Sequence, residues 1–111
     1  MLVKDIITDL DLNIFGGNKG LDREISGGYT SDLLSDVMGN AENGKIWITL
    51  QTHKNVIAIA SLKELAAVVL IKGLEPDKDM LAQAEEEGIP VLGTTDQSFE
   101  ITGKLFNMLS H

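Results

Sequence analysis

The polar segment 51–55 is the first place in this 111-residue chain where side chains could assemble a binding site. Its residues are Gln, Thr, His, Lys and Asn, all of which form hydrogen bonds. His53 is the one histidine of the chain that is not terminal. The segment follows the apolar run 46–50, and open parallel sheets bind ligands beyond the carboxyl ends of their strands. Two interpretations stay open: a ligand site that includes Gln51, Thr52 and His53, or a Thr52 helix cap with solvated neighbours.

The segment 27–32, with the sequence Gly-Gly-Tyr-Thr-Ser-Asp, is a second candidate. Two adjacent glycines let the backbone approach a ligand closely, and Ser31 or Asp32 can cap a helix that begins at Leu33. A small anion, such as a nucleotide or a phosphorylated metabolite, would then face a helix N-terminus. The spacing favours the alternative of a strand bulge followed by an ordinary cap. If both segments meet at one end of a sheet, the expected ligand-binding residues are Gly27, Gly28, Ser31, Asp32, Gln51, Thr52 and His53.

The segment 39–45 spells G-x-x-x-x-G-K, the pattern of a phosphate-binding loop, but it fails the requirements of that loop. Ile46 stands where a Ser or Thr must hold magnesium. The pattern also requires a strand before it and a helix after it, whereas here we expect the reverse. We therefore interpret the segment as a helix stop and a turn.

Residues for catalysis or for metal binding are scarce. The chain has no cysteine, and its two histidines, His53 and the terminal His111, cannot build an imidazole-rich site. Ser31, Asp32 and His53 have the side-chain types of a catalytic triad, but no G-x-S-x-G pattern is present. We expect no catalytic residue, no metal and no cofactor, and therefore no enzyme.

Apolar runs predict the elements that must position these segments. In the second half, strands are expected at residues 46–50, 66–71 and 90–93, separated by segments of helix length. Continuous apolar strands that alternate with helices predict an α/β fold with a mostly parallel sheet covered on both faces. Asp77 begins and Gly88 ends a predicted helix over residues 78–87. The first half predicts a helix over 3–10, a strand over 12–15, a turn over 16–20, an extended segment over 24–30 and a helix over 33–38.

The segment 55–65 is apolar on every side of its first two turns. Such a helix must be covered all round, and in a small domain this requirement indicates a subunit interface. We expect Val56, Ile59 and Leu62 to contact a second copy and form a homodimer. A long loop over the helix is the alternative.

Size and charge limit the partners and the location. A mass of 12.0 kDa predicts one domain over residues 1–111. The net charge of −8 makes nucleic acids and anionic membranes poor partners. The longest apolar run, 65–71, is far shorter than the ~20 residues of a membrane span, and the charges within 1–10 argue against a signal peptide. We expect a cytoplasmic protein.

The run 20–32 combines an acid–arginine pair with a double glycine, as Asp22, Arg23, Ser26, Gly27 and Gly28. In this form it resembles the DRTGG domain family, which is named for such Asp, Arg, Thr and Gly residues. Ser26 stands in place of the threonine, and Glu24 and Ile25 separate the two halves. The stretches 47–53, 66–70 and 85–91 are also similar to stand-alone members, so the resemblance covers nearly the whole chain.

The resemblance implies a single three-layer α/β/α sandwich, similar to the N-terminal domain of HPr kinase/phosphorylase. Family members also occur beside CBS domains in regulated pyrophosphatases and inside some phosphotransacetylases. There they resemble accessory, regulatory or dimerising modules, which implies an enzyme or signalling protein as partner. The alternative is an adaptor that needs no ligand. The serine-kinase name of some relatives does not transfer, because these 111 residues hold no nucleotide loop. Asp22 and Arg23 are expected to pair and hold their turn.

Overall fold

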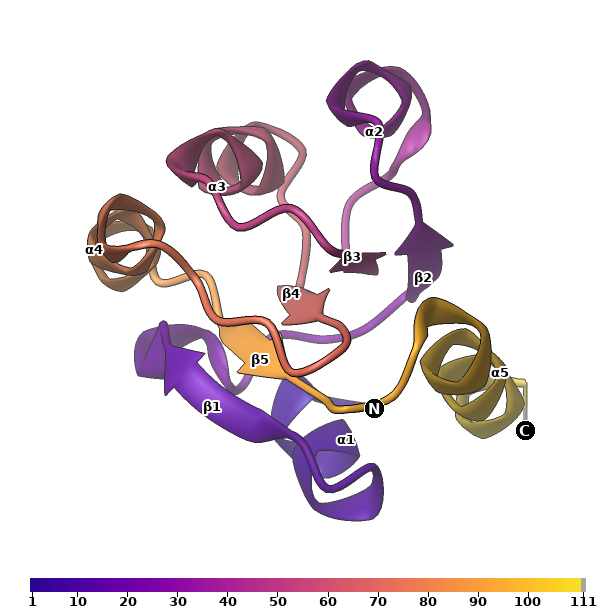
Figure 1. The fold of residues 1–111 in the computed structure, drawn as a ribbon. Helices are drawn as coiled ribbons and strands as arrows, with labels where there is room; N and C mark the ends of the chain where they lie inside the picture. Colours follow the sequence, from indigo (N-terminus) through magenta and orange to yellow (C-terminus); the bar gives the residue numbers. More distant parts are fainter. Residues whose placement is uncertain (111) are drawn as a thin grey trace.

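Within residues 1–110, which the computed structural model describes, the chain folds into five α-helices and five strands around one sheet (Figure 1). His111, considered above as a metal ligand, lies outside the described residues. The helices are α1 (Val3–Asp9), α2 (Leu34–Asn40), α3 (Lys54–Leu62), α4 (Lys78–Glu87) and α5 (Ser98–Leu109), with a short 3₁₀ helix η1 (Asn18–Gly20). The strands are β1 (Asn13–Gly16), β2 (Gly27–Thr30), β3 (Lys45–Thr49), β4 (Ala67–Leu70) and β5 (Val91–Gly93). None of the described helices is long and apolar enough to cross a bilayer.

The strands lie side by side in the order β1-β5-β4-β3-β2. Strands β2 to β5 run parallel, and β1 pairs antiparallel with β5 at one edge. The other edge strand, β2, pairs only with β3 within the described residues. Because four strands are parallel, their carboxyl ends meet at one end of the sheet and their amino ends at the opposite end. The mostly parallel sheet predicted from the apolar runs is confirmed.

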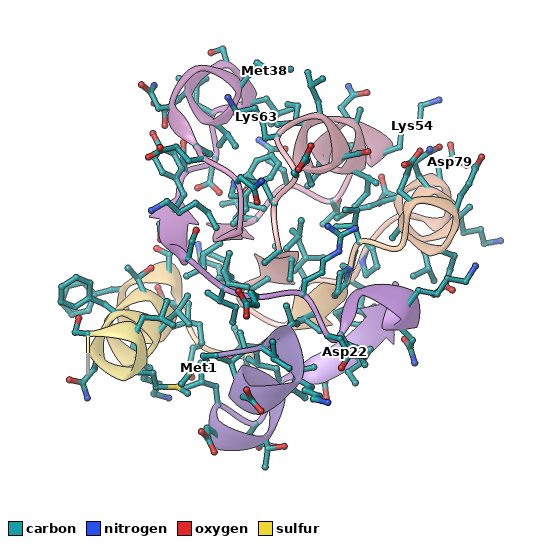
Figure 2. All side chains as sticks on the ribbon, turned by 180° about the vertical axis from the view of Figure 1, so that it is seen from behind. Met1, Asp22, Met38, Lys54, Lys63 and Asp79 are labelled. Carbon is teal, nitrogen blue, oxygen red and sulfur yellow. The ribbon has the colours of Figure 1, made fainter. Side chains whose placement is uncertain are left out.

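Helices cover both faces of the sheet. Helices α2, α3 and α4 lie on one face, and α1 and α5 lie on the other (Figure 1). Successive residues of β3 alternate between two cores: Trp47 packs with the first group of helices, whereas Ile46 and Ile48 pack with the second. Side chains fill the space between the sheet and the helices on both faces (Figure 2). This is the three-layer α/β/α sandwich that the resemblance implied.

Helix α3 corrects the prediction of a dimer interface. It lies between α2 and α4 (Figure 1), and both helices contact it. Val56 is 0% exposed and Ile59 is 7% exposed within the single chain, while Leu62 is 68% exposed. The apolar surround of this helix is therefore covered mainly by its own neighbours. Val56 and Ile59 are not available for contact with a second copy, and Leu62 alone of the three is.

Candidate functional site

The carboxyl end of the sheet brings Asp32 and Gln51 together, which is part of the condition that a shared site required. Asp32 Oδ1 accepts hydrogen bonds from Thr49 Oγ1 at 2.9 Å and from the backbone N–H of Leu50 at 2.8 Å. Gln51 Nε2 donates to the carbonyl oxygen of Asp32 at 2.9 Å. Ser31 belongs to the same turn, and its carbonyl oxygen accepts a 2.8 Å hydrogen bond from Trp47 Nε1. These polar groups satisfy one another and fasten the turn after β2 to the end of β3.

His53 and Thr52 continue this network toward α4. His53 occupies the N-cap position of α3, so of the two open interpretations the one with a Thr52 cap does not hold. The Nδ1 atom of His53 lies 2.9 Å from Asp77 Oδ2, and the N–H of Asp77 donates to the carbonyl oxygen of Thr52 at 3.0 Å. Asp77 is the N-cap residue of α4, so this contact joins the starts of two helices. The carboxylates of Asp32 and Asp77 place negative charge at this end of the sheet and disfavour an anion there.

Gly27 and Gly28 lie at the opposite end of the sheet. They pair with Lys45 and Ile46, the first residues of β3. At about 3.3 Å per residue, Gly27 and Ser31 are about 13 Å apart along the chain. The expectation that all seven residues surround one ligand is therefore wrong. The reason is topological: β2 and β3 are parallel, so the residues that begin one strand lie far from those that follow the other.

The double glycine instead borders a cavity of about 300 Å³ between the sheet and α5. A side-chain carbon built on Gly28 would lie 3.2 Å from Leu105 Cδ2, and one on Gly27 would lie 2.8 Å from Lys45 Nζ. The absence of side chains at both positions therefore keeps the cavity open. Its walls are formed by Ser26, Gly27, Gly28, Lys45, Ile48, Thr102, Leu105, Phe106, Leu109 and Ser110.

Comparison with known proteins identifies the family. The family model described as "DRTGG domain" matches residues 5–108. The chain belongs to the DRTGG domain family. No curated protein matches the chain significantly. One similar solved structure holds the CBS and DRTGG domains of the regulatory region of Clostridium perfringens pyrophosphatase, complexed with the activator diadenosine tetraphosphate. It has a TM-score of 0.74 and 16% sequence identity, and the match covers 95% of this chain and 45% of that chain. The likeness shows a shared fold.

The residues at the positions of the family motif, with Ser26 in place of the threonine, anchor one loop of this DRTGG domain. The Asp22 carboxylate forms an exposed 3.0 Å ion pair with Lys4 of α1, and this contact raises the pKa of Lys4 above its usual value (Figure 2, Asp22 labelled). Arg23 Nε donates to the carbonyl oxygen of Gly88 at 3.3 Å, at the end of α4. Ser26 Oγ donates to the carbonyl oxygen of Asn43 at 2.7 Å. The expected Asp22–Arg23 pair is replaced by contacts to three other parts of the fold.

A second polar contact ties β2 of the DRTGG domain to α2. The hydroxyl of Tyr29 donates to Asp36 Oδ2 at 2.9 Å. Hydrogen bonding to Asp36 raises the pKa of Tyr29, and hydrogen bonds from Ser31 and Tyr29 lower the pKa of Asp36. Both groups therefore keep their usual charge states over a wide pH range, which suits a structural contact.

Sequence reasoning missed the helical half of the cavity. The pattern over 39–45 points to Lys45 only as part of a phosphate loop, which the sequence excludes. Lys45 faces Gly27 because β2 and β3 pair in register, and a single sequence does not reveal that pairing. In residues 1–110, no three His, Cys, Asp or Glu side chains gather as metal ligands.

Proposed function

We propose that this DRTGG domain is a non-catalytic regulatory module that self-associates and binds a small anionic ligand. Through both properties it would act on a partner enzyme or signalling protein. Family membership and the fold shared with a pyrophosphatase regulatory region support the regulatory role. This chain spans 45% of the length of that structure, so the pyrophosphatase activity and its activator are not carried over. The observation that carries the proposal is the surface formed by β2 and α5.

Strand β2 is an unprotected edge. Its residues are Gly, Gly, Tyr and Thr, so it carries no charge. Soluble proteins usually protect edge strands with lysine, proline or a bulge, because the free backbone groups pair readily with another strand. An uncharged edge with Gly28 and Thr30 exposed is therefore suited to pairing with a strand of another molecule.

Two phenylalanines of α5 stand beside this edge. Phe99 is 85% exposed and Phe106 is 72% exposed. Thr102 lies between them at helical spacing, and its Oγ1 is 2.8 Å from Thr30 Oγ1 of β2. Residues 99, 102 and 106 therefore share the side of α5 that borders β2. We call β2 together with this side of α5 the β2–α5 face.

We assign a second copy to the β2–α5 face, because like charge does not oppose contact there. Two copies, each with a net charge of −8, repel one another over most of their surfaces. Strand β2 is uncharged, and α5 carries one acid, Glu100, and one base, Lys104. Antiparallel pairing of β2 with its copy would join the two sheets and bring both α5 helices together on one face. Such a contact is self-complementary, as a twofold dimer requires.

Sedimentation velocity over a concentration series tests self-association. We expect the wild type to form a dimer at high micromolar concentration and Phe99→Asp to remain monomeric. Leu62→Asp is the matched control, because Leu62 is an exposed apolar residue of α3, away from the β2–α5 face. Circular dichroism checks that both variants are folded. A monomeric wild type, or a dimer lost in Leu62→Asp but kept in Phe99→Asp, contradicts the proposal.

The ligand-binding half of the proposal is supported by the cavity beneath Gly27 and Gly28, where Lys45 supplies a cation. A ligand-free adaptor is the second candidate, and the self-satisfied hydrogen bonds at the carboxyl end of the sheet favour it. Ligand stabilisation by mass action separates the two. A melting-temperature increase with a small anion supports a binding module. A dimer that no small anion stabilises supports the adaptor.

A further inference from the structure

We propose that the cavity beneath Gly27 and Gly28 takes a small apolar carboxylate, with Lys45 pairing its anionic group. This inference rests on the proposed ligand-binding role and names the ligand class. The cavity walls contain four apolar side chains: Ile48, Leu105, Phe106 and Leu109. Ile48 and Leu105 are buried in the core, so the inner wall is fixed by the fold. A ligand that fills this space must present a largely apolar body.

The hydroxyl groups around the cavity are already engaged inside the protein. Ser26 Oγ donates to the carbonyl oxygen of Asn43, and Ser110 Oγ donates to the carbonyl oxygen of Phe106, each at 2.7 Å. Thr102 Oγ1 shares a 2.8 Å hydrogen bond with Thr30 Oγ1. A ligand rich in hydroxyl or amide groups would have to break these bonds to satisfy its own.

Lys45 is the cationic group of the cavity. Its Nζ lies over Gly27, 2.8 Å from the position that a side-chain carbon there would take. Among residues 1–110, no carboxylate forms an ion pair with it and no side-chain hydrogen bond uses its ammonium group. Lys45 is partly buried beside an apolar wall, where a charge pair is screened less than in open water. One anionic group on a ligand would therefore gain a charged hydrogen bond.

One cation and an apolar wall select a monoanion over a nucleotide. A polyphosphate requires several donors, such as a cluster of backbone N–H groups at a helix N-terminus or paired arginines. The cavity offers one ammonium group, and its volume of about 300 Å³ is at the lower end for small-molecule sites. A short aliphatic or aryl carboxylate matches both the single charge and the small volume.

Titrations followed by ¹⁵N–¹H NMR test this inference on the whole chain. The probes are 3-phenylpropanoate and octanoate, with 3-phenylpropanamide as the uncharged analogue and AMP as the nucleotide. We expect both acids to shift the amide signals of Gly27, Gly28 and Leu105. The amide analogue should bind about tenfold more weakly than its acid, because it lacks the charged hydrogen bond to Lys45.

Two lysine variants make the test specific. Lys45→Gln should weaken acid binding by about tenfold and leave binding of the amide analogue unchanged. Lys54→Gln is the matched control, and it should bind as the wild type does. Lys54 is an exposed lysine at the start of α3 (labelled in Figure 2), and α3 follows the carboxyl end of β3, whereas Lys45 begins β3. Gly28→Val fills the cavity beside Leu105 and should remove binding of the acids and of the amide analogue. The dispersion of the NMR spectrum confirms that each variant is folded.

Four results would overturn the inference. They are equal binding of acid and amide, acid binding unaffected by Lys45→Gln, signal changes centred on His53 in place of Gly28, and tighter binding of AMP than of either acid. If Lys45→Gln fails to fold, the comparison of acid with amide on the wild type still decides. Phe99→Asp separates self-association from acid binding. Phe99 belongs to the β2–α5 face but does not line the cavity, so its substitution should affect the dimer and leave the ligand site intact. A monomeric Phe99→Asp variant that still binds the acids would support both, and a wild-type dimer that binds no acid would reject the ligand class alone.

Discussion

Asp32 accepts a 2.9 Å hydrogen bond from Thr49 Oγ1, and Thr49 is a buried residue of β3. The same Asp32 oxygen accepts the N–H of Leu50. The Asp32 carboxylate therefore links the turn after β2 to the end of β3 through two hydrogen bonds. The Thr49 hydroxyl and the Leu50 N–H would both lose this acceptor without it. The geometry at this end of the sheet therefore explains Asp32 without a ligand.

Removal of the Asp32 carboxylate should destabilise the fold. Asp32→Ala leaves the buried Thr49 hydroxyl without its acceptor, which costs about 1–3 kcal/mol for an unsatisfied buried group, whereas the exposed Leu50 N–H can bond to water instead. Asp32→Asn retains one acceptor oxygen and should cost less. Urea unfolding at neutral pH measures both free energies. Equal stability of Asp32→Ala and the wild type would show that these hydrogen bonds contribute nothing.

Tyr29 should ionise at a higher pH than a free tyrosine. Its hydrogen bond to Asp36 raises the pKa of Tyr29 above the ordinary value of 10.0. Because this is the one tyrosine in the chain, ultraviolet absorbance during alkaline titration measures it directly. Asp36→Asn should lower the midpoint toward the ordinary value. An unchanged midpoint in that variant would show that Asp36 is not the cause.

The same shift predicts how stability changes in alkali. A raised folded-state pKa means that the folded protein holds the Tyr29 proton more tightly than the unfolded chain does. The resulting stabilisation is fully present below the unfolded pKa of about 10 and is lost as pH rises through the folded-state value. Tyr29→Phe cannot ionise and should lack this component of the alkaline loss, as urea unfolding on either side of pH 10 would reveal. Parallel losses in wild type and variant would contradict the linkage.

Two substitutions on α3 should separate core from surface. Ile59→Asp places a charge among buried apolar side chains and should cost several kcal/mol, enough to unfold much of the population. Leu62→Asp, three residues later on an exposed position, should change the free energy of unfolding by less than about 1 kcal/mol. Thermal unfolding by circular dichroism compares the two. A stable Ile59→Asp variant with altered self-association would restore the interface first predicted there.

The sequence predicted the repeating half of the fold well, because that half obeys local rules. Helix α4 begins after Asp77 and ends before Gly88, as predicted, and the apolar run 66–71 contains β4. Buried parallel strands are apolar on both faces, so a run of residues is enough to identify them. The predicted dimer interface on α3 was wrong for a physical reason. Apolar residues on every side of a helix indicate that the helix is covered, but they do not indicate which element covers it.

The candidate site depended on strand register, which a single sequence does not contain. Gly27 permits close approach of a ligand to the backbone, and His53 offers a polar side chain after a strand. The distance between them depends on where β2 begins relative to β3. Lys45 lies beside Gly27 only because β2 and β3 pair in this register. The exposure of Phe99 also depends on the tertiary structure. The spacing of apolar residues along α5 is the same whether that side of the helix is buried or exposed.

The same alanine substitution at three glycines should give a graded series of stabilities. Gly17 has φ +75°, and a side-chain carbon there would overlap the carbonyl oxygen of Ile89, so Gly17→Ala should cost several kcal/mol. Gly88 ends α4 with φ +66°, and the atom nearest to a side-chain carbon built there is Lys19 Cβ at 3.6 Å. Because this distance leaves room for a methyl group, Gly88→Ala should lower the free energy of unfolding by about 1 kcal/mol through backbone conformation alone. Gly39 lies in α2 with no atom within 4 Å of the same position, so Gly39→Ala should stabilise by about 0.5–1 kcal/mol. Urea unfolding of the three variants orders them, and a Gly17→Ala variant as stable as Gly39→Ala would show that the loop after β1 does not pack against the end of α4.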